Sequence, residues 1–272
     1  ALAANVGIAV AKFVAAAITG SSAMLTEGVH SLVDCTNQLL LMHGERQAAK
    51  PPDAAHPAGY GRELYFWSFV VALLVFALGA GVSVYQGVAH LLHPEPAVSP
   101  VVAFGVLLVA LVLEAGSALP AFRQFAEVRR GQSLWQALVA TKDASTVIVL
   151  LENGAAVAGI VIAAIGLALA ELTGNPHYDG VASILIGLLL ALVALFLARE
   201  AKGLLIGEAA DQELIAGVRR AASRDGIMGI GHIVTIHNAP QQVIAVVNVD
   251  FDNRFTIDFN LETLPLGSVL VV

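Results

Sequence analysis

Six long apolar runs constrain what this chain can fold into more than any other feature of its sequence. They lie near residues 2–20, 23–44, 64–92, 99–122, 144–172 and 178–198. A helix that crosses a lipid bilayer needs about 20 consecutive, mostly apolar residues. We therefore expect an all-α bundle of six transmembrane helices, with turn residues such as Gly20 and Pro176 in the breaks between the runs.

The composition supports a membrane protein and excludes several other classes. Of the 272 residues, 57 % are hydrophobic and 13 % are charged, whereas soluble domains carry about 25 % charged residues. This deficit excludes an ordinary cytosolic enzyme and a disordered protein. The net charge of −7 argues against a nucleic-acid partner, because such proteins neutralise phosphates with basic residues. A single cysteine excludes a disulfide framework and a cysteine-rich structural zinc site.

Lysine and arginine residues in the loops indicate the orientation of the bundle. They follow the second, fourth and sixth runs, at Arg46, Lys50, Arg62, Arg123, Arg129, Arg130, Arg199 and Lys202. The three loops on the opposite side contain neither residue type. Because cytoplasmic loops are enriched in lysine and arginine, we expect both termini in the cytoplasm. For this multi-pass protein we expect a bacterial inner (plasma) membrane first and an organellar membrane second.

The composition changes where the last apolar run ends. Four segments beyond it have patterns typical of a soluble domain, namely a polar helix at 211–224 and strands at 232–237, 242–251 and 268–272. The sequence therefore predicts a six-span transmembrane domain over residues 1–206 and a small cytoplasmic α+β domain over residues 207–272. So small a domain has little core of its own, which favours docking or dimerisation.

The second apolar run carries a row of polar residues. At about 100° per residue, five of them share one helical stripe, namely Glu27, His30, Asp34, Asn37 and Gln38. His30 and Asp34 are four residues apart, so both side chains lie on one face. An imidazole nitrogen and a carboxylate in this arrangement are suitable ligands for a divalent cation. The alternative is interhelical hydrogen bonding without a metal.

A carboxylate in the fifth apolar run is the candidate partner of this stripe. Glu152 lies deep in the run, where an ionisable side chain must face protein or water. Asp143 lies nine residues earlier and is half a turn out of phase on an ideal helix. Asp143 is therefore either a further metal ligand or a residue that points elsewhere, for instance toward Lys142.

Other polar residues have weaker patterns. Lys12 and Glu114, in the first and fourth runs, could pair with each other or help to relay protons. Asp179 lies at the start of the sixth run and is expected to cap its N-terminus. In the loop between the second and third runs, Asp53 and His56 could hold a second ion, or could belong to a capped turn.

Several motifs resemble those of the cation diffusion facilitator family of divalent-metal/proton antiporters. The first is Ser-Ser-Ala-Met-Leu-Thr-Glu-Gly-Val-His-Ser-Leu-Val-Asp at 21–34, and the second is Pro-Asp-Ala-Ala-His-Pro-Ala-Gly-Tyr-Gly-Arg at 52–62. Lys-Asp-Ala-Ser-Thr at 142–146, Leu-Leu-Glu-Asn-Gly-Ala-Ala at 150–156 and Thr-Gly-Asn-Pro-His-Tyr-Asp at 173–179 are similar to the branch that contains the mitochondrial zinc transporter of animals. The resemblance covers nearly the whole chain.

The resemblance implies a mid-membrane site for the transported ion at His30 and Asp34. The family usually supplies a histidine and an aspartate from its fifth helix, but no histidine occurs between residues 93 and 177. Glu152 and Asn153 are left as substitutes. This oxygen-rich set is harder than the usual one and therefore favours Mn²⁺ or Fe²⁺ as alternatives to Zn²⁺.

The resemblance also implies a loop site and a dimer. Asp53 and His56 match the family's loop site, although Tyr60 replaces a further histidine found in some members. The family's cytoplasmic domain resembles a metallochaperone and forms homodimers. We therefore predict a homodimeric transporter in membrane lipid, with divalent metal ions and protons as its partners and with no cofactor apart from the transported metal.

Two rival functions are carried with this prediction. A membrane metal sensor or scaffold would bind ions without moving them. An intramembrane metalloprotease is disfavoured, because the sequence has no His-Glu-x-x-His motif. We therefore expect a chain that is not an enzyme and that exports Zn²⁺ from the cytoplasm in exchange for protons.

Overall fold

The computed structural model describes residues 2–94, 99–128, 144–224, 226–240 and 242–251. They fold into two compact units. The first, which we call the helical unit, consists of Ala1–His43 and Trp67–Glu200. The second, which we call the mixed unit, consists of Gly44–Phe66 and Ala201–Val272.

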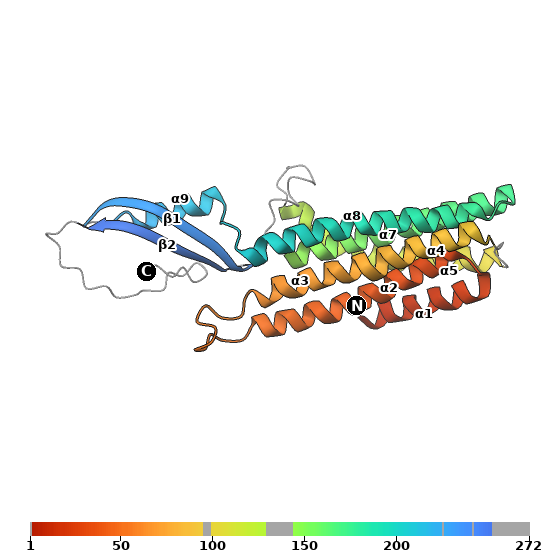
Figure 1. The fold of residues 1–272 in the computed structure, drawn as a ribbon, viewed down its shortest axis with the longest axis horizontal. Coiled ribbons are helices and arrows are strands. Elements are labelled where there is room, and N and C mark those ends of the chain that lie inside the picture. The colour runs from red at the N-terminus through yellow and green to blue at the C-terminus, as the bar shows by residue number, and fades with distance from the viewer. Residues whose placement is uncertain (1, 95–98, 129–143, 225, 241, 252–272) are drawn as a thin grey trace. The chain divides into compact units, whose positions relative to one another are not determined.

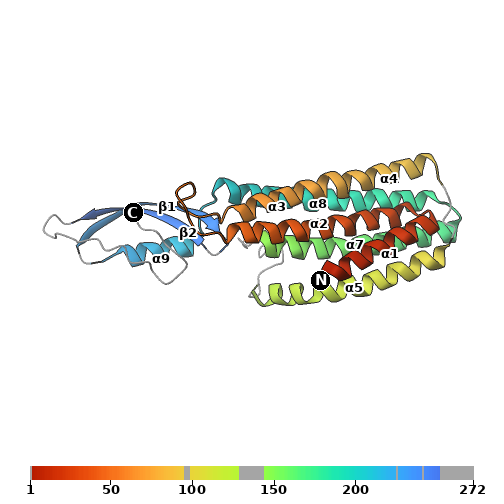
Figure 2. The ribbon, with the colours of Figure 1, turned by 90° about the horizontal axis from the view of Figure 1, so that it is seen from below.

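Each apolar run of the sequence coincides with helix in the described residues. The segments are α1 (Leu2–Thr19), α2 (Ser22–Ala48), α3 (Glu63–Leu74), η1 (Val75–Ala80), α4 (Gly81–Leu92), α5 (Pro100–Val128), α7 (Ala144–Thr173) and α8 (His177–Ile206). Figures 1 and 2 show these helices side by side with their axes nearly aligned. The π-helix η1, which the apolar pattern does not reveal, interrupts the helix that corresponds to the third run.

Three of these segments are long and apolar enough to cross a membrane, by length and composition alone. They are Glu63–Leu92, Val147–Thr173 and His177–Ile206, while Asn5–Thr19 and Pro100–Gly116 are shorter apolar helices. α2 is long but carries the polar stripe. The structure therefore confirms a mostly helical protein with three clear apolar spans, and the full set of six crossings stays a prediction.

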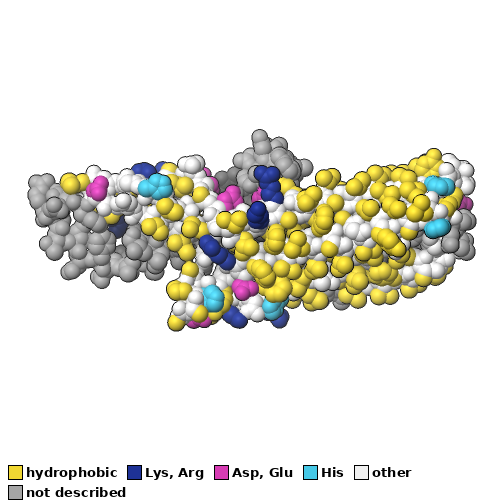
Figure 3. Space-filling view, in the orientation of Figure 1, with side chains coloured by type: hydrophobic (Ala, Val, Ile, Leu, Met, Phe, Trp, Pro, Cys, Tyr) yellow, Lys and Arg dark blue, Asp and Glu magenta, His cyan; other side chains and the backbone are white. Residues whose placement is uncertain are grey.

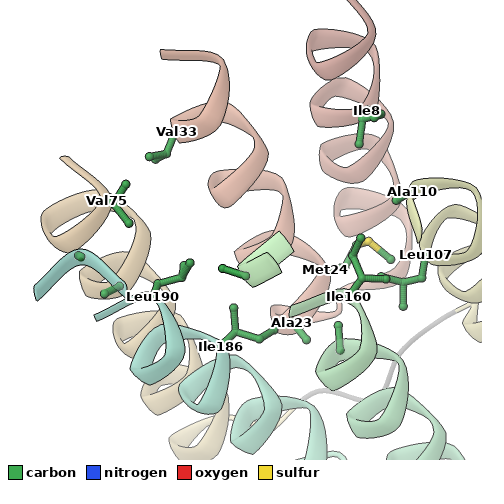
Figure 4. Close-up of a cluster of buried hydrophobic side chains, with 14 of the residues drawn as sticks. Ile8, Ala23, Met24, Val33, Val75, Leu107, Ala110, Ile160, Ile186 and Leu190 are labelled. Carbon is green, nitrogen blue, oxygen red and sulfur yellow. The ribbon is translucent and has the colours of Figure 1, made fainter. Parts of the chain in front are cut away.

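Apolar side chains both fill and cover the helical unit. Figure 4 shows part of its core, to which every helical segment except α3 and α4 contributes a labelled residue, among them Ile8, Val33, Val75, Leu107, Ile160 and Ile186. Hydrophobic side chains also cover the displayed face of the helices (Figure 3). Leu172 and Leu192 are 83 % and 68 % exposed. Such an extended apolar exterior is typical of a surface that contacts lipid.

α4 and α8 approach each other closely because glycines line their contact. A Cβ atom added to Gly87 would lie 2.7 Å from the carbonyl oxygen of Gly180. A Cβ atom added to Gly187 would lie 2.9 Å from the backbone nitrogen of Val84. Both distances are too short for a real side chain. Small residues therefore allow the two backbones to pack directly, as they do between helices in membranes.

Asp179 caps a different helix from the one expected. Its carboxylate accepts hydrogen bonds from the hydroxyl of Ser21 at 2.7 Å and from the backbone N–H of Ser22 at 2.6 Å. These groups lie at the N-terminus of α2, whose first N–H groups need partners outside the helix. The first turn of α8 is served instead by Asn175, whose Oδ1 accepts the N–H of His177 at 3.1 Å. Asp179 therefore fixes α8 to α2.

The mixed unit contains a helix and a two-stranded antiparallel sheet in its described part. The elements are α9 (Gln212–Ala222), β1 (Ile227–Ala239) and β2 (Gln242–Phe251), with Thr235 opposite Ala245. Asp211 caps α9, because its side chain accepts the N–H of Leu214 at 2.8 Å. The helix and two of the predicted strands are thus confirmed, with β1 starting five residues earlier than expected. The strand predicted at 268–272 lies outside the described residues.

The loop before α3 packs against β1 in this unit. The side-chain amide of Asn238 donates a hydrogen bond to the carbonyl oxygen of Ala58 at 2.9 Å. A Cβ atom added to Gly61 would lie 2.5 Å from the carbonyl oxygen of Asn238, so only glycine fits this contact. Residues 44–66 therefore fold with the C-terminal segment. The boundary between residues 206 and 207, which composition suggested, stays a prediction.

Candidate cation site

The polar stripe of α2 is buried in the helical unit. Glu27 and Asn37 are 0 % exposed, His30 is 2 % exposed and Asp34 is 9 % exposed. The spacing of three and four residues places these side chains on one face of the helix, as the sequence predicts. Gln38, the fifth member of the predicted stripe, is only half-buried. The stripe therefore faces protein along four of its five members.

His30 and Asp34 lie next to each other and have unused binding capacity. Nδ1 of His30 and Oδ1 of Asp34 are 3.6 Å apart, which is too long for a hydrogen bond. Within the described residues, neither ring nitrogen of His30 nor Oδ1 of Asp34 has a hydrogen-bond partner. Buried polar atoms are normally paired. Unpaired nitrogen and oxygen atoms at adjacent positions are therefore free to bind a cation.

Glu152 of α7 reaches the same stripe through a hydrogen bond. The side-chain amide of Asn37 donates to Oε1 of Glu152 at 2.6 Å, and Glu152 is 8 % exposed. The carboxylates of Glu152 and Asp34 are close enough to repel each other when both are ionised. The neighbouring Asn153 is half-buried. The sequence singled out Asn37 by helical spacing and Glu152 by its depth in an apolar run. It did not pair the two residues, because helical periodicity does not fix how one helix is rotated against another.

A second buried interaction lies next to this set. Nζ of Lys12, on α1, is 3.0 Å from Oε2 of Glu27 and donates a hydrogen bond to the hydroxyl of Ser31 at 2.8 Å. The sequence left two alternatives for Lys12 and Glu114, a pair with each other or a part in relaying protons. Glu114, on α5, is close enough to interact electrostatically with Lys12, but the ammonium group contacts Glu27. The signal that could have identified Glu27 is its place in the stripe, three residues before His30.

The predicted ligands are neighbours in the structure but do not form a closed ligand shell. Among the described residues, no three His, Cys, Asp or Glu side chains lie close enough together to hold a metal ion. His30 and Asp34 are brought together, and Glu152 is held beside them by Asn37. Asp143, the further candidate, lies outside the described residues. Binding with three ligands therefore requires these side chains to move closer together than they lie in this structure.

The candidate loop site is exposed and already hydrogen-bonded. Asp53 and His56 are about half exposed, with 3.6 Å between Oδ1 and Nδ1. Oδ1 of Asp53 accepts the backbone N–H groups of Ala55 and His56, and Oδ2 accepts the hydroxyl of Tyr60 at 2.7 Å. The hydrogen bond from Tyr60 and the backbone N–H of His56 lower the pKa of Asp53, and the same side-chain bond raises the pKa of Tyr60. This geometry is typical of a capped turn.

Comparison with known proteins places this arrangement in a family. Residues 1–206 match the cation efflux transmembrane domain. The proton-coupled zinc antiporter SLC30A9, mitochondrial, of Xenopus laevis is 35 % identical over 262 residues, which are 95 % of this chain and 47 % of that protein. The human protein of the same name is also 35 % identical over 262 residues, or 95 % of this chain and 46 % of its own length.

A plant relative gives a similar result. Metal tolerance protein C4 of Arabidopsis thaliana is 33 % identical over 244 residues, which are 89 % of this chain and 52 % of that protein. The chain therefore spans about half the length of the curated relatives it matches. With the matched domain covering most of its length, this chain belongs to the cation efflux, or cation diffusion facilitator, family, in the branch similar to the animal mitochondrial zinc transporter.

Proposed function

We propose that this chain is a secondary active transporter that exports divalent cations, Zn²⁺ foremost, from the cytoplasm in exchange for protons. Membership of the cation efflux family supports transport rather than catalysis. The observation that carries the proposal is the set of buried, unpaired ligand atoms on His30 and Asp34. A buried polar group without a partner costs about 1–3 kcal/mol. Such a cost within apolar helices is expected where a ligand completes the site.

The charges of the proposed ligands suit a divalent cation. Asp34 and Glu152 supply two negative charges, and His30 supplies a neutral nitrogen. Together they neutralise a divalent cation, which makes the loaded site tolerable in a low-dielectric environment. Asn37 holds the carboxylate of Glu152 in place until the ion arrives. Asn153 and Asp143 remain further candidate ligands in this proposal.

Proton exchange follows from the chemistry of the same residues. Histidine must be neutral and carboxylates must be ionised to bind a metal, so binding releases protons and protonation weakens binding. Histidine titrates in the physiological range. Protons that enter from the opposite side of the membrane would therefore displace the cation from His30 and Asp34. Rocking of helices around the site would provide alternating access.

The architecture that we propose around this site is the one that the sequence suggests. Six spans over residues 1–206 would place both termini in the cytoplasm, and residues 207–272 would form a metallochaperone-like domain that dimerises. A bacterial inner membrane stays part of the proposal. The word mitochondrial in the names of two relatives supports an organellar membrane as the alternative.

A harder cation is the second candidate substrate. In the described residues, the stripe and Glu152 offer more oxygen than nitrogen atoms, which favours Mn²⁺ or Fe²⁺ relative to a histidine-rich site. A metal sensor that binds without transport is the rival function. A second ion at Asp53 and His56 is also kept as a proposal, although both oxygens of Asp53 already accept hydrogen bonds.

Uptake driven by a pH gradient in proteoliposomes tests the proposal. The chain and its Glu152→Gln variant would each be assayed with Zn²⁺ and with Mn²⁺. We expect Zn²⁺ uptake by the chain and its loss in the variant, because one of the two balancing charges is gone. Glu213→Gln, which alters an exposed carboxylate of α9, serves as the matched control. Uptake of Mn²⁺ alone would show that Mn²⁺, and not Zn²⁺, is the substrate. Binding without uptake of either ion would favour the metal sensor.

A further inference from the structure

A fully buried ion pair lies one helical turn from the candidate ligands. Lys12 and Glu27 are both 0 % exposed, and Nζ and Oε2 are 3.0 Å apart. The hydroxyl of Ser31 accepts a second hydrogen bond from the same ammonium group at 2.8 Å. Charged side chains are rare inside apolar bundles and usually mark functional positions. The proposed ligand set of His30, Asp34 and Glu152 leaves this pair without a role.

The second oxygen of Glu27 is directed toward α7. Oε1 is buried and lacks a hydrogen-bond partner in the part of the chain that the structure describes. A Cβ atom added to Gly159 of α7 would overlap this oxygen, so a glycine leaves the space that the carboxylate occupies. Gly159 lies two helical turns beyond Glu152 on the same helix. Glu27 therefore presents an unused oxygen to the helix that supplies a proposed ligand.

We propose that Lys12 is a tethered counter-cation, which neutralises Glu27 and keeps this carboxylate out of the ligand set of the transported ion. The inference rests on the proposed function and assigns Lys12 the role of a positioning residue. A lysine ammonium is a compact point charge, and the side chain of Lys12 tethers it 3.0 Å from Oε2 of Glu27. Glu27 then adds no net negative charge to that of Asp34 and Glu152.

The pair keeps the charge of the site balanced in both states. When a divalent cation is bound, the ionised Asp34 and Glu152 neutralise it, and Lys12 neutralises Glu27. When the cation has left, protons on Asp34 and Glu152 leave the site neutral again. Without Lys12, Glu27 would add a third negative charge and a third acidic ligand, which would hold the cation more tightly.

Two other ionisable side chains, Glu114 and His30, interact electrostatically with the Lys12–Glu27 pair. Glu114 of α5 is 5 % exposed and lies within electrostatic range of Lys12, His30 and Asp34. His30 in turn lies within range of Lys12 and Glu27. Glu114 is therefore the competing acidic partner of Lys12, and a test has to separate its contribution from that of Glu27.

A charge cycle tests the inference. Zn²⁺ binding to the purified full chain in lipid nanodiscs would be measured by calorimetry for Lys12→Gln, Glu27→Gln and the double variant. At an effective dielectric constant of about 20, a unit charge within about 12 Å of the ion changes affinity by about tenfold or more. We expect Lys12→Gln to tighten binding by about that factor and Glu27→Gln to weaken it. The double variant should return the dissociation constant to within about threefold of the original, because the two charge changes cancel.

Three further variants separate charge from structure. Ser31→Ala removes the neutral partner of Lys12 without a change of charge, and Lys202→Gln alters an exposed lysine. Both should leave the dissociation constant within about threefold, since neither changes a charge at the site. Lys12→Gln combined with Glu114→Gln should bind Zn²⁺ more tightly than Lys12→Gln combined with Glu27→Gln, because Glu27 is the carboxylate that the lysine contacts. If Lys12→Gln does not fold, Glu27→Gln keeps the inference testable, because the ammonium group left without its carboxylate should still weaken Zn²⁺ binding.

Each contrary outcome has one meaning. If both single variants weaken Zn²⁺ binding and the double variant does not restore it, the pair is only structural and the inference is overturned. Weakening by Ser31→Ala to the same extent would lead to the same conclusion. If Glu114→Gln, and not Glu27→Gln, cancels the effect of Lys12→Gln, the inference is overturned and the counter-charge belongs to Glu114. An unaltered chain that binds no Zn²⁺ would overturn the proposed function itself.

Discussion

Two histidine–aspartate pairs in this protein have the same separation and very different surroundings. His30 and Asp34 in the helical unit, and His56 and Asp53 in the mixed unit, each have 3.6 Å between Nδ1 and Oδ1. The first pair is buried and its facing atoms lack hydrogen-bond partners among the described residues. The second pair is half exposed, and both aspartate oxygens accept hydrogen bonds. Residue type and distance are therefore not enough to define a cation site.

The difference is explained by what each aspartate gains from a cation. Asp53 already has the N–H groups of its own turn and the hydroxyl of Tyr60, and water reaches it, so a cation must displace existing partners. Among the described residues, Oδ1 of Asp34 and both ring nitrogens of His30 have no such partners, and both side chains are buried. A divalent cation would therefore relieve an unfavourable state at the buried pair. At the exposed pair it would only replace one favourable state by another.

The largest expected effect comes from replacing the aspartate of the buried pair, with the aspartate of the exposed pair as the comparison. Asp34→Asn should reduce Zn²⁺ transport by about 100-fold or more, because even residues that merely support a metal ligand change affinity by about 10–100-fold. Asp53→Asn should retain most of the transport. Initial rates of pH-driven Zn²⁺ uptake in proteoliposomes measure both. Equal losses in the two variants would show that the loop pair also binds the transported ion.

Hydropathy and helical spacing predicted the helix that carries the buried pair and the face that its two residues share. The second apolar run was expected at 23–44 and α2 spans Ser22–Ala48, because its apolar and polar positions follow the period of a helix. The same period placed His30 and Asp34 on one face, since residues four apart stack in any α-helix. Features that depend on a single helix were therefore predictable.

Features that depend on two helices were not. Spacing cannot tell how α1 is rotated against α2, so it did not identify Glu27 as the residue that Lys12 contacts. It also could not show that Asp179, in the first turn of α8, would serve the N-terminus of α2. For the exposed pair, the sequence left a capped turn and an ion site open. The hydrogen bond from Tyr60 to Asp53 gives the structural support for the turn.

A methyl group added to α7 at Gly159 tests how closely the helices pack beside the buried pair. Gly159→Ala places a Cβ atom where Oε1 of Glu27 lies, so the carboxylate or the helix must move. Overpacking of this kind destabilises by about 1–3 kcal/mol, and we expect a lower thermal unfolding temperature in detergent together with weaker Zn²⁺ binding. Gly154→Ala is the matched control, because its Cβ would lie 3.8 Å from Phe122. Equal unfolding temperatures for the two variants would contradict the close contact with Glu27.

The cap between α8 and α2 should have a smaller effect. Asp179→Ala removes the acceptor for Ser21 and for the N–H of Ser22, and loss of an N-terminal cap costs about 0.5–2 kcal/mol. Amide hydrogen exchange should become faster in the first turn of α2 (Ser22–Ala48). Glu27 and His30 lie further along the same helix. Asp211→Ala removes the cap of α9 in the same way and should accelerate exchange in α9 alone. Unchanged protection of α2 in the first variant would show that the cap contributes nothing.

The smallest expected effect concerns the exposed pair alone. Tyr60→Phe removes the hydroxyl that donates to Asp53, so the lowered pKa of Asp53 should rise toward its usual value. A carboxyl whose pKa is lower in the folded state adds stability above its unfolded pKa and loses that stability as the pH falls through the folded value. The variant should therefore lose part of this pH dependence in the acidic range, while the backbone N–H groups of Ala55 and His56 maintain the rest. NMR of the Asp53 carboxyl carbon measures the pKa directly. His56→Ala should shift it less, because the backbone N–H of residue 56 still donates to Asp53. A larger shift in His56→Ala would mean that the imidazole charge dominates the exposed pair, and that the pair has more of a cation site's electrostatics than its hydrogen bonds suggest.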